Sequence, residues 1–126
     1  MLVKIATADA LVVEQLMAQL NNVKVLGCNG RETRYLDPVD GVCVHSFSRD
    51  RKLLDSAMKL WDIRVEFEPF VGWKARVVDE TGVERLVEAA ERELVISKAL
   101  LAAIYGLEAD LRPLEQVCES VTGGLY

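Results

Sequence analysis

Residues 47–106 read FSRDRKLLDSAMKLWDIRVEFEPFVGWKARVVDETGVERLVEAAERELVISKALLAAIYG, and this stretch decides the fold of the chain. It opens with a helix-start signal. Ser48 has a short polar side chain that can accept a hydrogen bond from a free amide of the first turn, and Asp50 adds negative charge near the positive end of the helix dipole. We therefore expect Ser48 to cap a helix. Its buried stripe is predicted to contain Leu54, Ala57, Met58 and Trp61.

A β-hairpin is predicted after this helix, from the alternation of apolar and charged residues over 63–68 and 73–78. Pro69 to Gly72 forms the turn between the two strands. In an antiparallel pairing Glu66 and Glu68 lie opposite or diagonal to the basic residues of the second strand, and each such pair contributes about 0.2–1 kcal/mol. One face of this hairpin is polar, so we expect either water or a partner to cover it.

The third part of the stretch is a helix over residues 91–105, which Gly106 ends. The segment before it, residues 83–90, fits both a third strand and an extension of this helix, and the two alternatives stay open. The unit of helix, hairpin and helix over 47–106 is the expected core of a single domain, residues 1–126. The predicted fold class is α+β, a small antiparallel sheet packed with helices in an α/β sandwich.

The flanking segments carry weaker signals. Thr7 or Asp9 can cap a helix running to about Leu20. A strand over 23–27 precedes the hairpin signal Asn29-Gly30. Further signals follow along the chain: a turn over 37–41, a strand over 42–47 and a last helix from Pro113.

Composition places the chain among globular proteins. Of its 126 residues 51% are hydrophobic and 28% charged, and no apolar span is long enough to cross a bilayer. The start of the chain lacks the features of a signal peptide. Three widely spaced cysteines, Cys28, Cys43 and Cys118, argue for reduced thiols rather than a disulfide framework. We therefore expect a cytoplasmic protein without a membrane partner.

The net charge of −5 is concentrated in the second half of the chain. Six acids and two arginines lie between residues 79 and 93. Such a segment suits a basic protein partner and disfavours a phosphate backbone. The alternative is a solvated face that maintains solubility. The candidate partner-binding residues are Asp79, Glu80, Glu84, Glu88, Glu91 and Glu93.

A local group of basic residues supports a second hypothesis, a nucleic-acid-binding module. If the segment around residue 31 folds back on the helix start at residue 49, these side chains form an anion pocket near free helix amides. Interleaved acids and scarce aromatic residues weaken this interpretation. The candidate anion-binding residues are Arg31, Arg34, Arg49, Arg51 and Lys52.

Catalytic signals are few. Cys43 and His45 lie two residues apart on one predicted strand face, the spacing of a potential nucleophile and base. A half-buried strand face is the preferred explanation of both residues, since a free cysteine behaves mostly as a small hydrophobe. The chain has no C-x-x-C pair and no glycine-rich phosphate motif, so we predict no metal and no cofactor.

The central unit resembles the phage ABA sandwich domain, a family of small bacteriophage and prophage proteins. The resemblance rests on Phe47-Ser48-Arg49-Asp50, the aliphatic helix after it, Gly72-Trp73, and residues 96–101 in the following helix. It covers about half of the chain. It implies a phage origin and an α/β sandwich, but the family has no general activity and no catalytic residue transfers.

Together these observations predict a non-catalytic phage or prophage accessory protein in the host bacterial cytoplasm. It would act by stoichiometric protein binding, for example as an inhibitor of a host process or of an antiviral defence system. The polar hairpin face also leaves a homodimer as an alternative.

Overall fold

A computed structural model describes residues 1–29 and 32–112 of the chain. These residues form three α-helices, two short 3-10 helices and eight strands, which confirms the predicted α+β class. In chain order the elements are β1 (Leu2–Lys4), η1 (Ile5–Thr7), α1 (Ala10–Leu20), β2 (Lys24–Cys28), β3 (Thr33–Asp37), β4 (Gly41–His45), η2 (Phe47–Arg49), α2 (Arg51–Trp61), β5 (Arg64–Glu68), β6 (Gly72–Val78), β7 (Glu84–Ala89), α3 (Arg92–Tyr105) and β8 (Glu108–Asp110).

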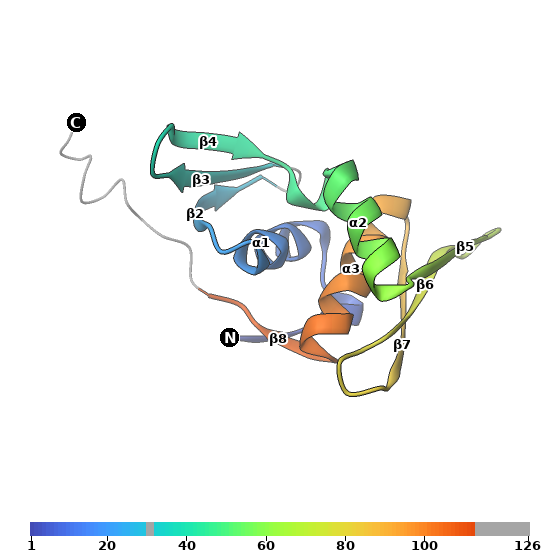
Figure 1. Cartoon of the computed structure of the whole chain (residues 1–126). Coiled ribbons are helices and arrows are strands. Elements are labelled where there is room, and N and C mark those ends of the chain that lie inside the picture. Colours follow the sequence, from blue (N-terminus) through green and yellow to red (C-terminus); the bar gives the residue numbers. More distant parts are fainter. Residues whose placement is uncertain (30–31, 113–126) are drawn as a thin grey trace.

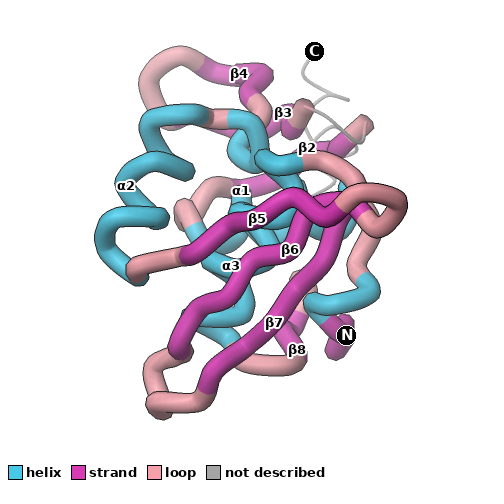
Figure 2. Tube along the Cα trace, turned by 90° about the vertical axis from the view of Figure 1, so that its right-hand side faces the viewer, coloured by secondary structure: helices cyan, strands magenta, loops and turns pink. Residues whose placement is uncertain are grey.

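The helices lie between two three-stranded antiparallel sheets (Figure 1). One sheet has the order β2-β3-β4 and packs on α1. The other has the order β5-β6-β7 and packs on α3, while α1 and α2 both contact α3. Each sheet thus has helices on one face, and Figure 2 shows the other face of β5-β6-β7 with no helix over it. Strands β1 and β8 pair as a separate two-stranded ribbon.

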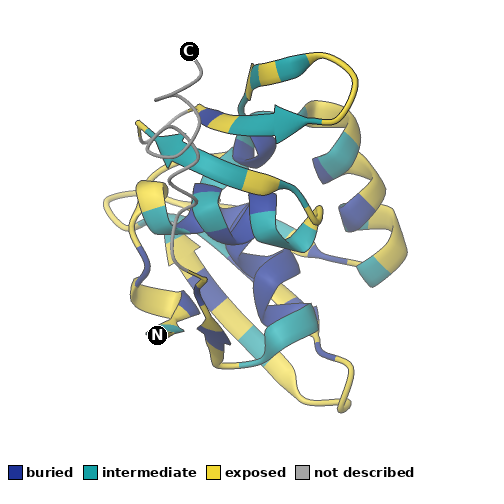
Figure 3. Ribbon diagram, turned by 90° about the vertical axis from the view of Figure 1, so that its left-hand side faces the viewer, coloured by how far each residue is buried: buried dark blue, intermediate teal, exposed yellow. Residues whose placement is uncertain are grey.

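Helix α3 is the centre of the core. Nine of its fourteen residues are buried, because it has apolar side chains on nearly every side. Such a helix must be surrounded by other elements, whereas an amphipathic helix needs only one covered face. Figure 3 shows this buried centre in dark blue, with partly buried and exposed elements around it. Gly106, at φ +82°, ends the helix as predicted.

Two helix caps are aspartates. Asp9 caps α1 by accepting a hydrogen bond from Val12 N, and Asp50 caps α2 by accepting one from Leu53 N at 3.1 Å. The prediction that Ser48 caps the second helix is therefore wrong. Ser48 lies in η2, and its hydroxyl donates to the carboxylate of Glu14 at 2.6 Å. A carboxylate accepts the helix amides better than a hydroxyl that is already engaged elsewhere.

Glu14 is the polar centre of the core. Its side chain is fully buried and accepts from Thr33 Oγ1 at 2.7 Å, Phe47 N at 2.8 Å and Ser48 N at 3.0 Å. The donors come from β3 and η2, so one carboxylate of α1 joins three elements. Ser97 of α3 extends the network by donating to the carbonyl of Ser48 at 3.2 Å. Buried polar groups of this kind are tolerated because they are hydrogen-bonded.

Of the ambiguous residues 83–90, Glu84–Ala89 form strand β7, so the strand alternative is correct. Exposed side chains at Glu84, Leu86 and Glu88 alternate with less exposed ones, which is the two-residue period of a strand. The hairpin of β5 and β6 is confirmed, with Glu66 opposite Lys74 and Phe67 opposite Trp73. Phe67 is exposed and contacts Trp73 edge to face, because the hairpin projects beyond the helices (Figure 1).

The predicted turn over 37–41 is confirmed: Asp37 accepts hydrogen bonds from Val39 N and Asp40 N, and Gly41 has φ +79°. The strand predicted over 42–47 ends earlier, at His45, because Phe47 begins η2. The second residue of the Asn29-Gly30 signal and the helix predicted from Pro113 lie outside the described residues.

Candidate functional site

The six acids of the predicted partner-binding segment fall into three separate places. The first two lie at the turn between β6 and β7, the middle two lie on β7, and the last two flank the start of α3. Each place gives the carboxylates a different environment. The segment is therefore not one continuous acidic surface.

Asp79 is used inside the protein. Its buried carboxylate accepts from Thr81 Oγ1 at 2.6 Å, Val83 N at 3.0 Å and Arg85 Nε at 2.8 Å. These donors, foremost the Thr81 hydroxyl and the Val83 amide, hold the pKa of Asp79 far below its usual range. Asp79 shapes the turn, and it is not available to a partner. Glu80, its neighbour, is exposed.

Glu91 and Glu93 both face Arg49. The guanidinium of Arg49 lies 2.9 Å from Glu91 Oε2 and 3.8 Å from Glu93 Oε1. These ion pairs tie η2 to the start of α3. Arg49 is consequently removed from the predicted anion-binding group, and the two acids are partly neutralised.

Glu84 and Glu88 remain as outward acids on β7, with Leu86 between them on the same face and 51% exposed. We call the outward side chains of β5, β6 and β7 the charged sheet face. Across it Lys74 lies opposite Glu66 and Glu88, and it forms ion pairs with Glu68 and, at 3.7 Å, with Glu88. These acids, Glu68 first, raise the pKa of Lys74.

The charged sheet face has basic residues as well. Arg64 and Arg76 lie directly opposite each other on β5 and β6, next to the exposed Leu86. Like charges directly opposite on neighbouring strands are unfavourable. The face therefore combines an arginine pair, a row of acids and an exposed aliphatic side chain, a mixture that suits protein recognition better than a uniform electrostatic field does.

The predicted anion-binding residues do not come together in the described structure. Arg34 lies on the outward face of β3, and Arg51 and Lys52 lie in the first turn of α2. The amide that the anion pocket needs is occupied, since Leu53 N donates to Asp50. Arg31 lies outside the described residues.

Cys43 and His45 share the inward face of β4 but engage different groups. Cys43 Sγ contacts the carbonyl of Gly41 at 3.8 Å, while His45 Nε2 lies 3.0 Å from Asp50 Oδ2. The ring of His45 also packs edge to face on Phe47. Imidazole and thiol are thus held toward opposite ends of the strand, which is poor geometry for a nucleophile and its base.

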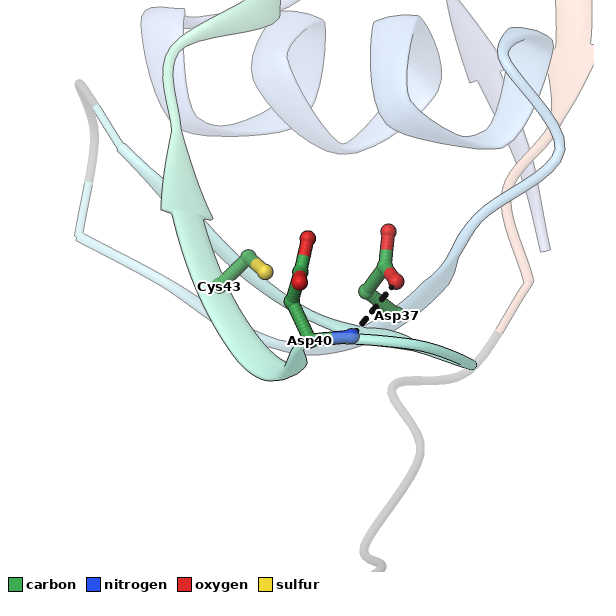
Figure 4. Close-up of side chains that lie close together, drawn as sticks. All are labelled: Asp37, Asp40 and Cys43. Atoms are coloured by element: carbon green, nitrogen blue, oxygen red, sulfur yellow. Dashed lines mark hydrogen bonds between the residues drawn. The ribbon is translucent and has the colours of Figure 1, made fainter.

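One cluster, at the hairpin of β3 and β4, was not predicted from the sequence. Ligand atoms of Asp37, Asp40 and Cys43 lie within 4.8 Å of one another (Figure 4). Two carboxylates and a thiol are donors that a divalent cation accepts. The amides of Asp40 and Val39 already occupy one oxygen of Asp37 and lower its pKa. The three-residue spacing D-x-x-D-x-x-C across the turn is the signal that would have revealed it.

No family model, curated protein or solved structure matches this chain. The resemblance to the phage ABA sandwich domain therefore stays a prediction. No helix formed by the described residues is long and apolar enough to span a membrane.

Proposed function

We propose that this protein acts without catalysis, by binding another protein through the charged sheet face. The observation that carries the proposal is the arrangement of Glu84, Leu86 and Glu88 on β7, where two outward acids flank a half-exposed leucine on a sheet face with no helix over it. An apolar centre with charged neighbours is the usual anatomy of a protein–protein interface.

The partner is a protein with a basic surface. The acids Glu66, Glu84 and Glu88 attract it and set its orientation, and Leu86 provides apolar area to bury. The resemblance to the phage family adds a biological setting: the chain is a phage accessory protein that inhibits a bacterial process or a defence system. Only the resemblance supports that setting, and the charged sheet face supports the binding mode.

Nucleic-acid binding remains a prediction with less support. Its described candidate side chains lie on different elements, Arg34 on β3 and Arg51 and Lys52 on α2, and Arg49 is paired with Glu91. The enzyme hypothesis has lost its main argument, because Cys43 and His45 engage different groups.

The test is affinity capture from a bacterial lysate with three forms of the protein. The wild type is compared with Glu84→Lys/Glu88→Lys, and with Glu32→Lys/Glu108→Lys, which makes the same change of charge at exposed positions outside the charged sheet face. We expect a specific partner with the wild type and with the control pair, and at least about tenfold less of it with the β7 pair. Equal recovery with both pairs, or no specific partner at all, overturns the proposal.

A further inference from the structure

Strand β4 differs from the other edge strands of the described structure. The edge strands β1, β2, β5, β7 and β8 each carry at least one Lys, Arg, Asp or Glu, whereas β4 reads Gly-Val-Cys-Val-His and has none. Charged residues on an edge strand prevent pairing with another chain, because a buried charge opposes the new contact. Strand β4 lacks this protection.

The outward face of β4 is apolar as well. Val42 and Val44 are 54% and 55% exposed, and Leu36 lies opposite Val42 on β3. Figures 1 and 3 show β4 at the border of the molecule, with no described element along its free side. Exposed β-branched residues on an unpaired edge are the side chains that cross-strand pairing stabilises best.

We propose that β4 pairs with β4 of a second copy of this chain, antiparallel and about a two-fold axis at Cys43. The two β2-β3-β4 sheets then form one six-stranded sheet, and the two-fold axis closes the assembly after two copies. This inference goes beyond the proposed function, because β7 lies at the edge of the other sheet and stays free in both copies.

The register of this pairing is self-complementary. Val42 of one copy lies opposite Val44 of the other, so four valines meet at the centre of the outward face. His45 lies opposite Gly41, where the absence of a side chain leaves room for the imidazole. Next to this apolar centre come Leu36 and Arg34 of each copy, and Lys24 lies opposite Leu36. The result is an apolar core with a basic rim, as protein interfaces have.

The inward face of β4 is also compatible with this pairing. Asp37 lies opposite Gly41 on the neighbouring strand, so His45 of the second copy approaches the carboxylates of Asp37 and Asp40. The two Cys43 side chains face each other across the axis. Directly opposite residues of an antiparallel pair have Cβ atoms about 4.5–5.5 Å apart. A short thiol-reactive cross-linker therefore reports on this register.

The first experiment is sedimentation equilibrium of the purified, reduced protein over micromolar to millimolar concentrations. A five-residue strand pair buries less area than a standard interface, so we expect a concentration-dependent dimer. Val44→Lys puts a charge on the edge and should raise the dissociation constant at least about tenfold. Val78→Lys is the matched control, because Val78 is 51% exposed on the other sheet, and it should leave the dimer unchanged. Circular dichroism checks that Val44→Lys and Val78→Lys both fold.

The second experiment treats the Cys28→Ser/Cys118→Ser form, in which Cys43 is the one remaining thiol, with a short bis-maleimide. We expect a covalent dimer that Val44→Lys suppresses. A wild-type monomer at all concentrations, a dimer that Val44→Lys leaves intact, or a dimer without the Cys43 cross-link each overturns the proposal. None of these outcomes depends on the partner that the charged sheet face binds, so the two proposals fail separately.

Discussion

Two buried carboxylates show how single residues hold this fold together. Glu14 gathers donors from β3 and η2, and Asp79 gathers donors from the turn that follows β6. In both cases the surrounding amides and hydroxyls replace water around the carboxyl group. Removing either carboxylate leaves those donors buried without an acceptor, which costs more than the hydrogen bonds contribute when they are made.

For Glu14 we expect the substitution Glu14→Gln to lower the free energy of unfolding by about 3 kcal/mol, because Phe47 N donates to one carboxylate oxygen and Ser48 N to the other, so either orientation of the new amide sets its NH2 group against a backbone donor. Urea denaturation followed by circular dichroism measures this change. Glu32→Gln, at an exposed position, should stay within about 0.5 kcal/mol of the wild type. A similar small change in both variants would contradict the role assigned to Glu14.

The carboxylate of Asp79 should make the stability of the fold depend on pH. Its pKa is lowered in the folded state, so the folded protein binds fewer protons here than the unfolded chain does. Its stabilising contribution is therefore complete above the unfolded value of about 3.8 and is lost as the pH falls below it. We expect the difference in Tm between the wild type and Asp79→Asn to be large at pH 7 and to shrink below this value. A difference that does not vary with pH would contradict the assignment.

At the scale of elements, the junction of β6 with β7 depends on a close backbone approach. Gly72 has φ +115°, and a Cβ placed there would lie 2.9 Å from the carbonyl oxygen of Ala89. Gly82 also has a positive φ, but a Cβ there meets no atom within 4 Å. The two glycines therefore share the cost of an unfavourable φ and differ in the clash.

We expect Gly82→Ala to cost about 1–2 kcal/mol, the price of a left-handed conformation for alanine, and Gly72→Ala to cost clearly more. Thermal unfolding of the two variants gives the comparison. An equal loss of stability in both variants would contradict this expectation. It would mean that β7 moves away from Gly72 at Ala89 with little cost.

At the scale of the whole molecule, the two sheets are connected through the helices packed between them. Strand β2 packs on α1, α1 packs on α3, and α3 packs on β6 and β7. Among the described residues, each sheet is covered on one face only, by helices that also contact the helices of the other sheet. A single core of this kind should unfold in one cooperative step.

We test this with one probe in each sheet. Cys28 lies on β2, where burial raises the pKa of its thiol and slows its reaction, and Trp73 lies on β6. In a Trp61→Phe/Cys43→Ser/Cys118→Ser background, in which Trp73 is the one tryptophan and Cys28 the one thiol, thiol reactivity and tryptophan fluorescence should change at the same urea concentration. Two separate midpoints would show that the sheets unfold independently.

Local signals in the sequence determined much of the architecture. The alternation over 63–68 and 73–78, the turn at Asp37 to Gly41 and the stop at Gly106 all correspond to observed elements, because each depends on residues that are neighbours along the chain. The acidic character of residues 79–93 was also evident. Asp9, one of the two caps predicted for the first helix, is the observed one, whereas the prediction for Ser48 was wrong because its hydroxyl donates to a residue 34 positions away.

Tertiary structure alone decided which side chains remain available for function. It placed Asp79 inside a turn, paired Arg49 with Glu91, separated Cys43 from His45 in their contacts, and left β4 as the one uncharged edge among the described strands. These outcomes depend on contacts between residues far apart in the chain, which spacing and composition do not encode locally. The sequence determined the kinds of element, and the packing of those elements around α3 determined which surfaces are free.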